Sequence, residues 1–296
     1  MSEIIMQALS EYGIDRVTST RQIDNKNILE IDNRYILKSL SSNQENAEKE
    51  ARLNALLYQE NAPVAKIHLT KTNGYYVFVD GNYYIFLDKL RGTTVYNIYE
   101  GSSKKRVYSL GRTLAKFHLA SKKIENKVKL WNNNIMDELH GWVLKEIREK
   151  QIPIMPEVIQ YCIDFTDLYH SLPRQIIHRD PHSYNMSMEN DEIIGIVDFG
   201  ISQINSRVFD MCYAFQPNEK NFDKWLAHRS YFFSGYHEVS PISENERDGY
   251  SYMCILLELL CVAFWSTRKR EDKLEENIKH VHWLYSVRNE IRPVYL

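Results

Sequence analysis

Residues 176–185 read IIHRDPHSYN, and residues 196–200, shortly after them, read IVDFG. In both stretches two apolar residues run directly into a polar segment, as happens where a buried strand ends. These segments carry three oxygen-bearing side chains, Asp180, Asn185 and Asp198. Two interpretations fit the pattern: an ordinary polar turn between two strands, or a site for a metal ion and for proton transfer.

The turn sequence ENDE (189–192) separates two apolar segments and predicts a β-hairpin. If Met188 lies opposite Ile193, then Asn185 lies opposite Ile196. Asp198 is two residues beyond Ile196, and side chains two apart in a strand share a face. We therefore expect Asn185 and Asp198 to be diagonal neighbours that can reach a common ion.

Two oxygen ligands at the end of a strand suit Mg²⁺, because this ion keeps several waters and completes its shell with phosphate oxygens. Asp180 lies five residues before Asn185 and could orient an attacking hydroxyl or accept its proton. The order H-R-D-x-x-x-x-N followed by D-F-G is the arrangement found in protein kinases. Either motif alone is a weak signal, but both in this order favour the site over the turn.

In protein kinases such a site also needs a phosphate-binding lysine, which is held by a carboxylate and lies in a separate, N-terminal lobe. Lys38 interrupts an apolar strand and is either that lysine or a solvated residue at a sheet edge. Glu50 lies on a predicted helix at offsets of three from Ala47 and Leu53 and seven from Leu57, so it shares their buried stripe. A buried carboxylate requires a cation. We therefore expect Lys38 and Glu50 to pair.

The pattern of segments predicts an α+β chain with two lobes. Residues 1–90 contain short β-rich segments separated by turn sequences and one helix at 44–60, which predicts a five-stranded antiparallel sheet plus one helix. Residues 91–296 are mainly helical, for example at 104–121, 135–149 and 156–171, apart from one β-rich island at 176–200. We expect a small-molecule site in the cleft between the lobes.

The composition limits the functional classes. A formal charge of −2 over 296 residues supplies no basic field for a nucleic acid. The four cysteines lie in apolar stretches without metal-binding spacing, as in a reducing compartment. The N-terminus lacks the pattern of a signal peptide, and the apolar run 253–265 is too short to span a bilayer. We expect a cytoplasmic protein, monomeric or homodimeric, with neither nucleic acid nor membrane as a partner.

Several segments resemble the aminoglycoside phosphotransferase-like group of small-molecule kinases, which also includes choline, homoserine and methylthioribose kinases. The matching segments are YILK (35–38), FLDKLRG (86–92), LGRTLAKFHLAS (110–121), HRDPHSYNM (178–186), IVDFG (196–200) and VFDMCYAF (208–215). The resemblance covers most of the first 215 residues. It implies a bilobal protein-kinase-like fold that uses ATP and Mg²⁺.

The resemblance also assigns roles by position. It implies that Asp180 is the catalytic base and that Asn185 and Asp198 hold Mg²⁺. The hinge backbone, formed by Asp88, Lys89 and Leu90, would bind adenine. Lys38, held by Glu50, would bind the α- and β-phosphates.

Two further residues receive structural roles from the same resemblance. Asp210 would tie down the catalytic loop. His178 would pack under that loop rather than contact the substrate.

The chain departs from protein kinases in two ways. The first two predicted strands contain no G-x-G-x-x-G. Asp210 follows only twelve positions after Asp198, and no A-P-E comes after it. A long activation loop with a peptide platform is therefore missing, which favours a small acceptor. A serine/threonine protein kinase of the same subfamily and a non-catalytic nucleotide-binding protein are the alternatives.

The acceptor cannot be read from the sequence. Residues 201–296 hold 13 acidic and 12 Lys or Arg side chains, which argues against a polycationic antibiotic, and the acidic run 243–248 is typical of a solvated helix start. A set of aromatic residues could form a cage for a quaternary amine, although their helical spacing favours core packing: Tyr231, Phe232, Phe233, Tyr236, Trp265 and Trp283. The predicted function is transfer of the γ-phosphate of ATP to a hydroxyl of an antibiotic, amino acid, amino alcohol or sugar.

Overall fold

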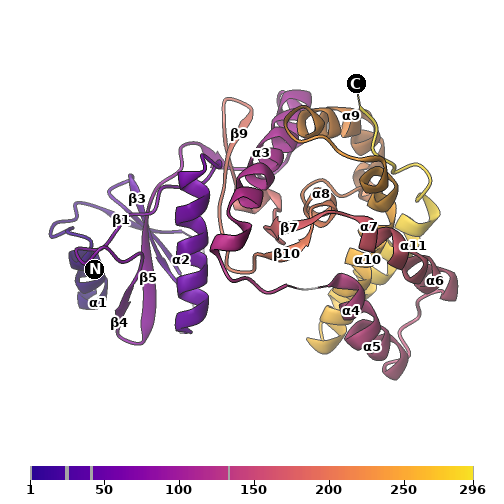
Figure 1. Ribbon diagram of the computed structural model, residues 1–296, viewed down its shortest axis with the longest axis horizontal. Coiled ribbons are helices and arrows are strands. Elements are labelled where there is room, and N and C mark those ends of the chain that lie inside the picture. The colour runs from indigo at the N-terminus through magenta and orange to yellow at the C-terminus, as the bar shows by residue number, and fades with distance from the viewer. Residues whose placement is uncertain (1, 24–26, 41–42, 133, 296) are drawn as a thin grey trace.

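The computed structural model describes residues 2–23, 27–40, 43–132 and 134–295, and it shows a sheet-based lobe beside a larger helical lobe (Figure 1). The sheet consists of β1 (Thr20–Ile23), β2 (Ile28–Ile31), β3 (Tyr35–Ser39), β4 (Val77–Val79) and β5 (Asn82–Asp88). Its strand order is β1-β2-β3-β5-β4, and all neighbours are antiparallel. The predicted five-stranded antiparallel sheet is confirmed.

Two hairpins of this sheet use the turn residues that their backbone requires. Asp32 and Asn33 between β2 and β3 have φ of 51° and 53°, and Asp80 and Gly81 between β4 and β5 have φ of 47° and 78°. Positive φ at both central positions matches the right-handed twist of the flanking strands, and Asp, Asn and Gly adopt it most readily. The turn between β2 and β3 sets the register that places Lys38 opposite Ile28, and the pairing of β3 with β5 places it opposite Ile85, in the middle of the sheet.

The sheet carries helices on both faces, so the expectation of one helix in this lobe was wrong. The predicted helix is α2 (Gln44–Gln59), and α1 (Glu3–Glu11) is additional. Figure 1 shows α1 and α2 on opposite sides of the sheet. Along β5, Tyr84 and Phe86 pack with the α1 side, whereas Ile85 and Leu87 pack with the α2 side. Because both faces of β5 are apolar, the sheet needs a second cover, and α1 provides it.

The large lobe contains most of the helices. They are α3 (Ser103–Lys123), α4 (Ile135–Glu138), α5 (Leu144–Glu149), α6 (Pro156–Asp164), α7 (Thr166–Ser171), α8 (Val208–Ala214), α9 (Phe222–Val239), α10 (Glu244–Thr267) and α11 (Glu271–Ser286). A π-helical turn, Leu139–Val143, joins α4 to α5 without a break. The three helical segments expected at 104–121, 135–149 and 156–171 are present, the last of them divided into α6 and α7.

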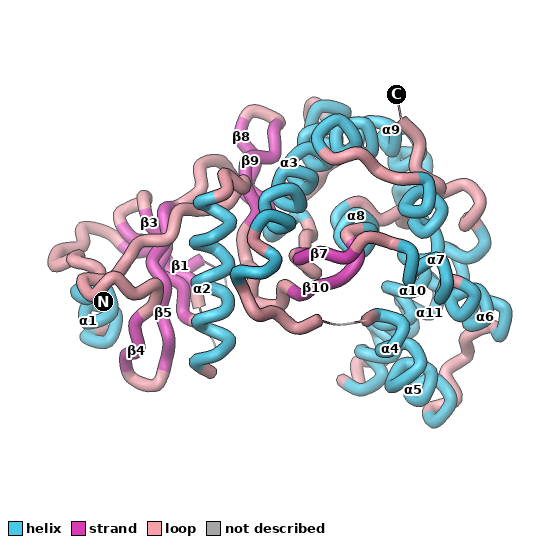
Figure 2. The backbone as a smooth tube through the Cα atoms, viewed as in Figure 1, coloured by secondary structure: helices cyan, strands magenta, loops and turns pink. Residues whose placement is uncertain are grey.

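Short strands form two small sheets in this lobe. One contains β6 (Thr93–Thr94), β8 (Met186–Glu189) and β9 (Glu192–Ile196), and the other contains β7 (Arg174–Ile177) and β10 (Gln203–Ser206). Figure 2 shows the β8–β9 hairpin at the junction with the sheet lobe, next to α3. The proposed division between residues 90 and 91 stays a prediction.

Helices α3 and α9 pack unusually closely because each presents a glycine to the other. A Cβ at Gly111 would lie 2.1 Å from the Phe232 carbonyl oxygen, and one at Gly235 would lie 2.2 Å from that of Tyr108. No side chain fits at such distances, so both glycines are required for this contact. On α9, Phe232, Phe233 and Tyr236 are fully buried and belong to the core, as their spacing indicated, whereas Tyr231, Trp265 and Trp283 are partly buried.

Helix α10 is the central helix of the large lobe. Among the described residues it is the helix that could cross a membrane by length and composition, yet 67% of its most apolar window is buried against the rest of the chain. Cys254 and Leu256 on α10 are fully buried. This burial is typical of a core helix.

Candidate active site

The β8–β9 hairpin has a different register from the predicted one. Met188 lies opposite Ile193 as expected, but a bulge follows, so that Ser187 pairs with Gly195 and Met186 with Ile196. The Val197 N–H donates to the Asn185 carbonyl at 3.0 Å. Asn185 therefore faces Val197 and not Ile196. The extra residue in β9 produces this shift, and it still brings Asn185 next to the residue that precedes Asp198.

Asn185 and Asp180 are hydrogen-bonded to each other within the loop of residues 178–186, the proposed catalytic loop. Asn185 Nδ2 donates to the Asp180 carbonyl oxygen at 2.9 Å and to Asp180 Oδ2 at 3.1 Å. The amide nitrogen is thereby directed at two oxygens, which leaves Oδ1 as the atom that Asn185 can offer to a cation. This orientation fits the role of a metal ligand.

Lys38 joins the two lobes at this loop. Its Nζ lies 2.5 Å from Glu50 Oε1 and 2.8 Å from Asp198 Oδ1. β3 is an inner strand of the sheet, so the alternative of a solvated edge lysine is wrong, and the expected Lys38–Glu50 pair is confirmed. Burial lowers the pKa of Lys38, but Glu50 and Asp198 outweigh burial and raise that pKa, so Lys38 is charged.

The surroundings of Asp198 favour the ionised form of its carboxyl, as a metal ligand would require. Burial raises the pKa of its carboxyl, but Lys38 outweighs burial and lowers that pKa. Its side chain is 53% exposed, which leaves room for an ion and its waters. The described residues contain no group of three or more His, Cys, Asp or Glu side chains that could hold a metal. A site with Asn185 and Asp198 as its two protein ligands fits Mg²⁺, which takes few protein ligands, better than a metal that needs a full protein cage.

The predicted hinge is already partly hydrogen-bonded within the small lobe. The Asp88 N–H donates to the Lys66 carbonyl and the Lys89 N–H to the Arg34 carbonyl, both at 2.8 Å. The Leu90 side chain packs against Gly195, where an added Cβ would approach it to 2.5 Å. Adenine binding by this segment stays a prediction, and the carbonyl groups and the Leu90 N–H are the atoms that could provide it.

His178 packs beneath the loop, as expected. It is fully buried, and Phe199 lies edge-on to it with ring centroids 5.1 Å apart. His178 Nε2 donates to the Val197 carbonyl at 2.9 Å, and His178 Nδ1 accepts from the Asp180 N–H at 3.2 Å. Burial lowers the pKa of His178, so the ring is neutral and holds Asp180 and Val197 in place.

Asp210 ties down the loop, as expected. Its Oδ2 accepts from the His178 N–H at 2.7 Å and its Oδ1 from the Arg179 N–H at 2.9 Å. Arg179 has a φ of 73°, in the left-handed region, where a residue other than glycine is strained. The two hydrogen bonds to Asp210 offset this cost and set the direction in which the chain enters Asp180.

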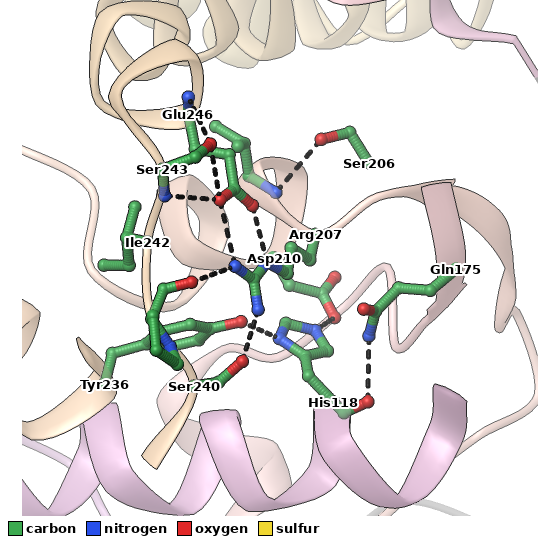
Figure 3. Close-up of polar contacts among 12 residues, drawn as sticks. His118, Gln175, Ser206, Arg207, Asp210, Tyr236, Ser240, Ile242, Ser243 and Glu246 are labelled. Carbon is green, nitrogen blue, oxygen red and sulfur yellow. Dashed lines mark hydrogen bonds and ion pairs between the residues drawn. The ribbon is translucent and has the colours of Figure 1, made fainter. Parts of the chain in front are cut away.

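A buried chain of polar side chains supports Asp210 from behind (Figure 3). His118 Nε2 lies 3.0 Å from Asp210 Oδ2, and His118 Nδ1 lies 2.5 Å from the Tyr236 hydroxyl. A carboxylate only accepts, so Nε2 carries the proton and Nδ1 accepts from Tyr236. Burial lowers the pKa of His118, which keeps the ring neutral.

This series of buried polar side chains extends to Arg207, whose guanidinium lies 5.5 Å from the centre of the Tyr236 ring. Arg207 donates to both carboxylate oxygens of Glu246, at 2.5 and 2.9 Å, and to Ser240. Glu246 is 2% exposed, so the interpretation of residues 243–248 as a solvated helix start was wrong at this position. The helix start itself is correct, because Ser243 caps α10.

Sequence reasoning did not find this supporting chain. His118 and Tyr236 lie 118 residues apart, and Arg207 and Glu246 lie 39 apart. One local signal was present: Ser243 and Glu246 form a capping box, in which the glutamate turns back towards the helix start. The pairing of that glutamate with Arg207 depends on how α8 and α10 pack.

Residues 20–241, more than half of the chain, match the Phosphotransferase enzyme family. The chain belongs to this family. It is 24% identical over 261 residues to a homoserine kinase of Zymomonas mobilis, a match that covers 84% of this chain and 78% of that relative.

Solved structures show the same fold. A microcompartment-associated aminopropanol kinase superposes with a TM-score of 0.68 at 15% identity, covering 97% of this chain and 96% of its own. An amicoumacin kinase in complex with AMP-PNP, Ca²⁺ and Ami superposes with a TM-score of 0.64 at 13% identity, covering 94% of this chain and 90% of its own. The fold class expected from the motifs, a bilobal protein-kinase-like fold, is confirmed, and the protein is a phosphotransferase.

Proposed function

We propose that this phosphotransferase transfers the γ-phosphate of ATP to a hydroxyl of a small molecule in the presence of Mg²⁺. The observation that carries this proposal is the contact of Lys38 with both Glu50 and Asp198, beside the loop that contains Asp180. This contact joins a phosphate-binding cation of one lobe to a metal-binding carboxylate of the other. The family match and the homoserine kinase relative support a small acceptor over a protein acceptor.

Each side chain has a defined task in this proposal. Asp180 orients the acceptor hydroxyl and takes its proton as the oxygen attacks the γ-phosphorus. The new P–O bond forms to the acceptor oxygen while the bond between the γ-phosphorus and the bridging oxygen breaks, and ADP leaves with that oxygen. Lys38 binds the α- and β-phosphates and is held in place by Glu50.

Asn185 and Asp198 are the proposed ligands of Mg²⁺. When bound, this ion supplies positive charge to the terminal phosphates. Asp198 Oδ1 accepts from Lys38 Nζ at 2.8 Å. Burial raises the pKa of this carboxyl, but the contact with Lys38 outweighs burial and lowers that pKa, so Asp198 would meet the ion in its charged form. A cytoplasmic location and a monomeric or homodimeric state stay predictions.

A thermal-shift titration with ATP and Mg²⁺ tests nucleotide and metal binding together. At a ligand concentration of about 100 times Kd, binding should stabilise the protein by roughly 2.7 kcal/mol. Asp198→Ala should remove the part of the shift that depends on Mg²⁺. Asp272→Ala is the matched control, because Asp272 is exposed at the start of α11 and pairs there with Arg270.

Phosphate transfer is then measured as ADP formation that depends on an added hydroxyl compound. The panel contains amino alcohols, amino acids, sugars and aminoglycosides. The absence of any Mg²⁺-dependent shift, or of acceptor-dependent ADP formation across the panel, would refute the proposed function. Labelling of a casein-like protein in place of every small acceptor would favour a protein kinase.

A further inference from the structure

A cavity of about 420 Å³ lies beside the catalytic loop. Three stretches of the large lobe provide most of its lining: residues 95–99, the loop residues His182, Ser183 and Met186, and residues 213–216 at and just beyond the end of α8. Its floor is apolar, with Val95 and Phe215 almost fully buried. The volume is within the usual range for small-molecule sites, of the order of 300–1,000 Å³.

The cavity is adjacent to the proposed catalytic base. His182, which lines the cavity, has its Nε2 3.5 Å from Asp180 Oδ2. Tyr213, also in the lining, has a raised pKa, first because it is buried and second because of the nearby Asp180 carboxylate. Two residues of the lining, His182 and Tyr213, thus lie next to the Asp180 carboxylate.

The lining consists of apolar side chains, neutral polar side chains and His182. Among the described residues that line the cavity, none is Asp, Glu, Lys or Arg. An acceptor that carries a carboxylate or phosphate would thus lose water without gaining a cationic partner, which is unfavourable. An ammonium group differs, because the aromatic rings of Tyr96, Tyr99 and Tyr213 attract a cation.

Gln216 adds a hydrogen-bond acceptor to the lining. Its Nε2 donates to Glu258 Oε1 at 3.0 Å, and since a carboxylate only accepts, Gln216 Oε1 is the atom left for a ligand. Glu258 is held in turn by His280 Nδ1 at 3.3 Å, while His280 Nε2 donates to the Pro217 carbonyl at 3.1 Å. Both ring nitrogens of His280 face acceptors. Burial lowers the pKa of His280, but Glu258 outweighs burial and raises that pKa, which favours the charged form of the ring beside this carboxylate.

We infer that the acceptor of this enzyme is an amino alcohol without a carboxylate or phosphate group, held by the tyrosines of the cavity and by Gln216 Oε1, with its hydroxyl at Asp180. The inference rests on the proposed function. It separates this chain from its homoserine kinase relative, because homoserine carries both an ammonium and a carboxylate. Gln216 is the residue that selects the ammonium end.

Three probes of the same chain length isolate the two charges. 3-Aminopropan-1-ol is L-homoserine without its carboxylate, and propane-1,3-diol has a hydroxyl in place of the ammonium. A pocket that offers no partner to an additional neutral hydroxyl disfavours the substrate that carries it by roughly 10²-fold. A carboxylate costs more to desolvate than a hydroxyl, so it should be disfavoured at least as strongly. We expect kcat/KM for 3-aminopropan-1-ol to exceed that for L-homoserine by at least about 100-fold and to exceed that for the diol clearly.

The outcomes separate the two proposals. If L-homoserine equals or exceeds the amino alcohol, the inference is wrong, while the proposed phosphotransferase function stands. If the diol or an uncharged sugar is the best acceptor, the role of the ammonium is wrong. If no hydroxyl compound accepts phosphate, the proposed function fails and the inference fails with it.

A charge-adding variant provides an independent test. Gln216→Arg places a cation in the lining, and we expect it to shift the ratio of kcat/KM values towards L-homoserine by about 10-fold or more. Gln160→Arg adds the same charge on the exposed face of α6 and should leave the ratio unchanged. Folding of both variants is checked by nucleotide binding, which does not involve Gln216. An unchanged ratio in a Gln216→Arg protein that binds nucleotide would contradict the assignment of the cavity.

Discussion

Replacing Tyr236 by Phe tests whether the buried chain behind Asp210 holds the catalytic loop in its working position. The Tyr236 hydroxyl lies 2.5 Å from His118 Nδ1, and both side chains are buried. The variant keeps the ring next to Arg207 but removes the donor to Nδ1. His118 Nε2 can still donate to Asp210, but Nδ1 becomes a buried acceptor without a donor, so the ring loses one of the two contacts that fix its orientation behind Asp210.

The expected size follows from these contacts. A buried acceptor left without its hydrogen bond costs about 1–3 kcal/mol, so the free energy of unfolding should fall by that amount. Because about 1.4 kcal/mol corresponds to a factor of ten in rate, a loop that loses this restraint should show a kcat reduced roughly 10-fold. The Kd for nucleotide should change little, since the contacts of Lys38 are untouched.

The assay combines urea unfolding, a nucleotide titration and steady-state kinetics with a saturating acceptor. Tyr169→Phe is the matched control. Its hydroxyl is also buried and donates to Asn205 Oδ1 at 2.7 Å, with no bond to Asp210. We expect this control to lose similar stability and to keep its kcat. If Tyr236→Phe also keeps the wild-type kcat while losing stability, the buried polar side chains behind Asp210 stabilise the fold only, and their proposed role in holding the catalytic loop is refuted.

Three further predictions concern the base, the helix contact and pH. Asp180→Asn should lower kcat by roughly 10²–10⁴-fold, as for a lost general base, with an unchanged nucleotide Kd; near-wild-type turnover would exclude this role. Gly111→Ala should destabilise the protein by about 1–3 kcal/mol or more in urea unfolding, because its methyl group would overlap the Phe232 carbonyl, and wild-type stability would show that α3 and α9 can separate. Burial lowers the pKa of His118 and of His178, so below their ordinary pKa of about 6.5 the unfolded chain binds more protons than the folded one. Stability should therefore fall as pH drops below that value, by up to about 1.4 kcal/mol per pH unit for each histidine. Burial lowers the pKa of His280, but Glu258 outweighs burial and raises that pKa. The stability that His280 contributes is therefore lost as pH rises above about 6.5. Unfolding curves should thus show maximal stability near pH 6.5, and a flat profile from pH 5 to 8 would contradict these assignments.

Much of the candidate site could be predicted because its residues lie close together along the chain or follow a local period. Asp180, Asn185 and Asp198 belong to short motifs whose order indicates their chemistry. Glu50 was placed by helical periodicity alone, and its contact with Lys38 is confirmed. Local spacing carries this information because the repeat of a helix or strand determines which side chains share a face.

Other features could not be read locally. A bulge at Ile194 changed the partner of Asn185, and such a bulge depends on how β9 packs against α3 and the small lobe. The helix α1 was missed because its apolar face matters only once the second face of the sheet is known. The hinge N–H groups of Asp88 and Lys89 are occupied by neighbours that only the folded lobe supplies.

The sequence by itself determined the type of fold, the phosphotransfer motifs and the pair Lys38–Glu50. Only the tertiary structure decided what supports the motifs and what they act on. His118, Arg207, Tyr236 and Glu246 form one buried chain because α3, α8, α9 and α10 meet behind Asp210. The cavity that we propose as the acceptor site likewise arises from stretches far apart in the sequence. Local periodicity specifies the face on which a side chain lies, whereas the packing of helices far apart in sequence specifies which side chain it meets.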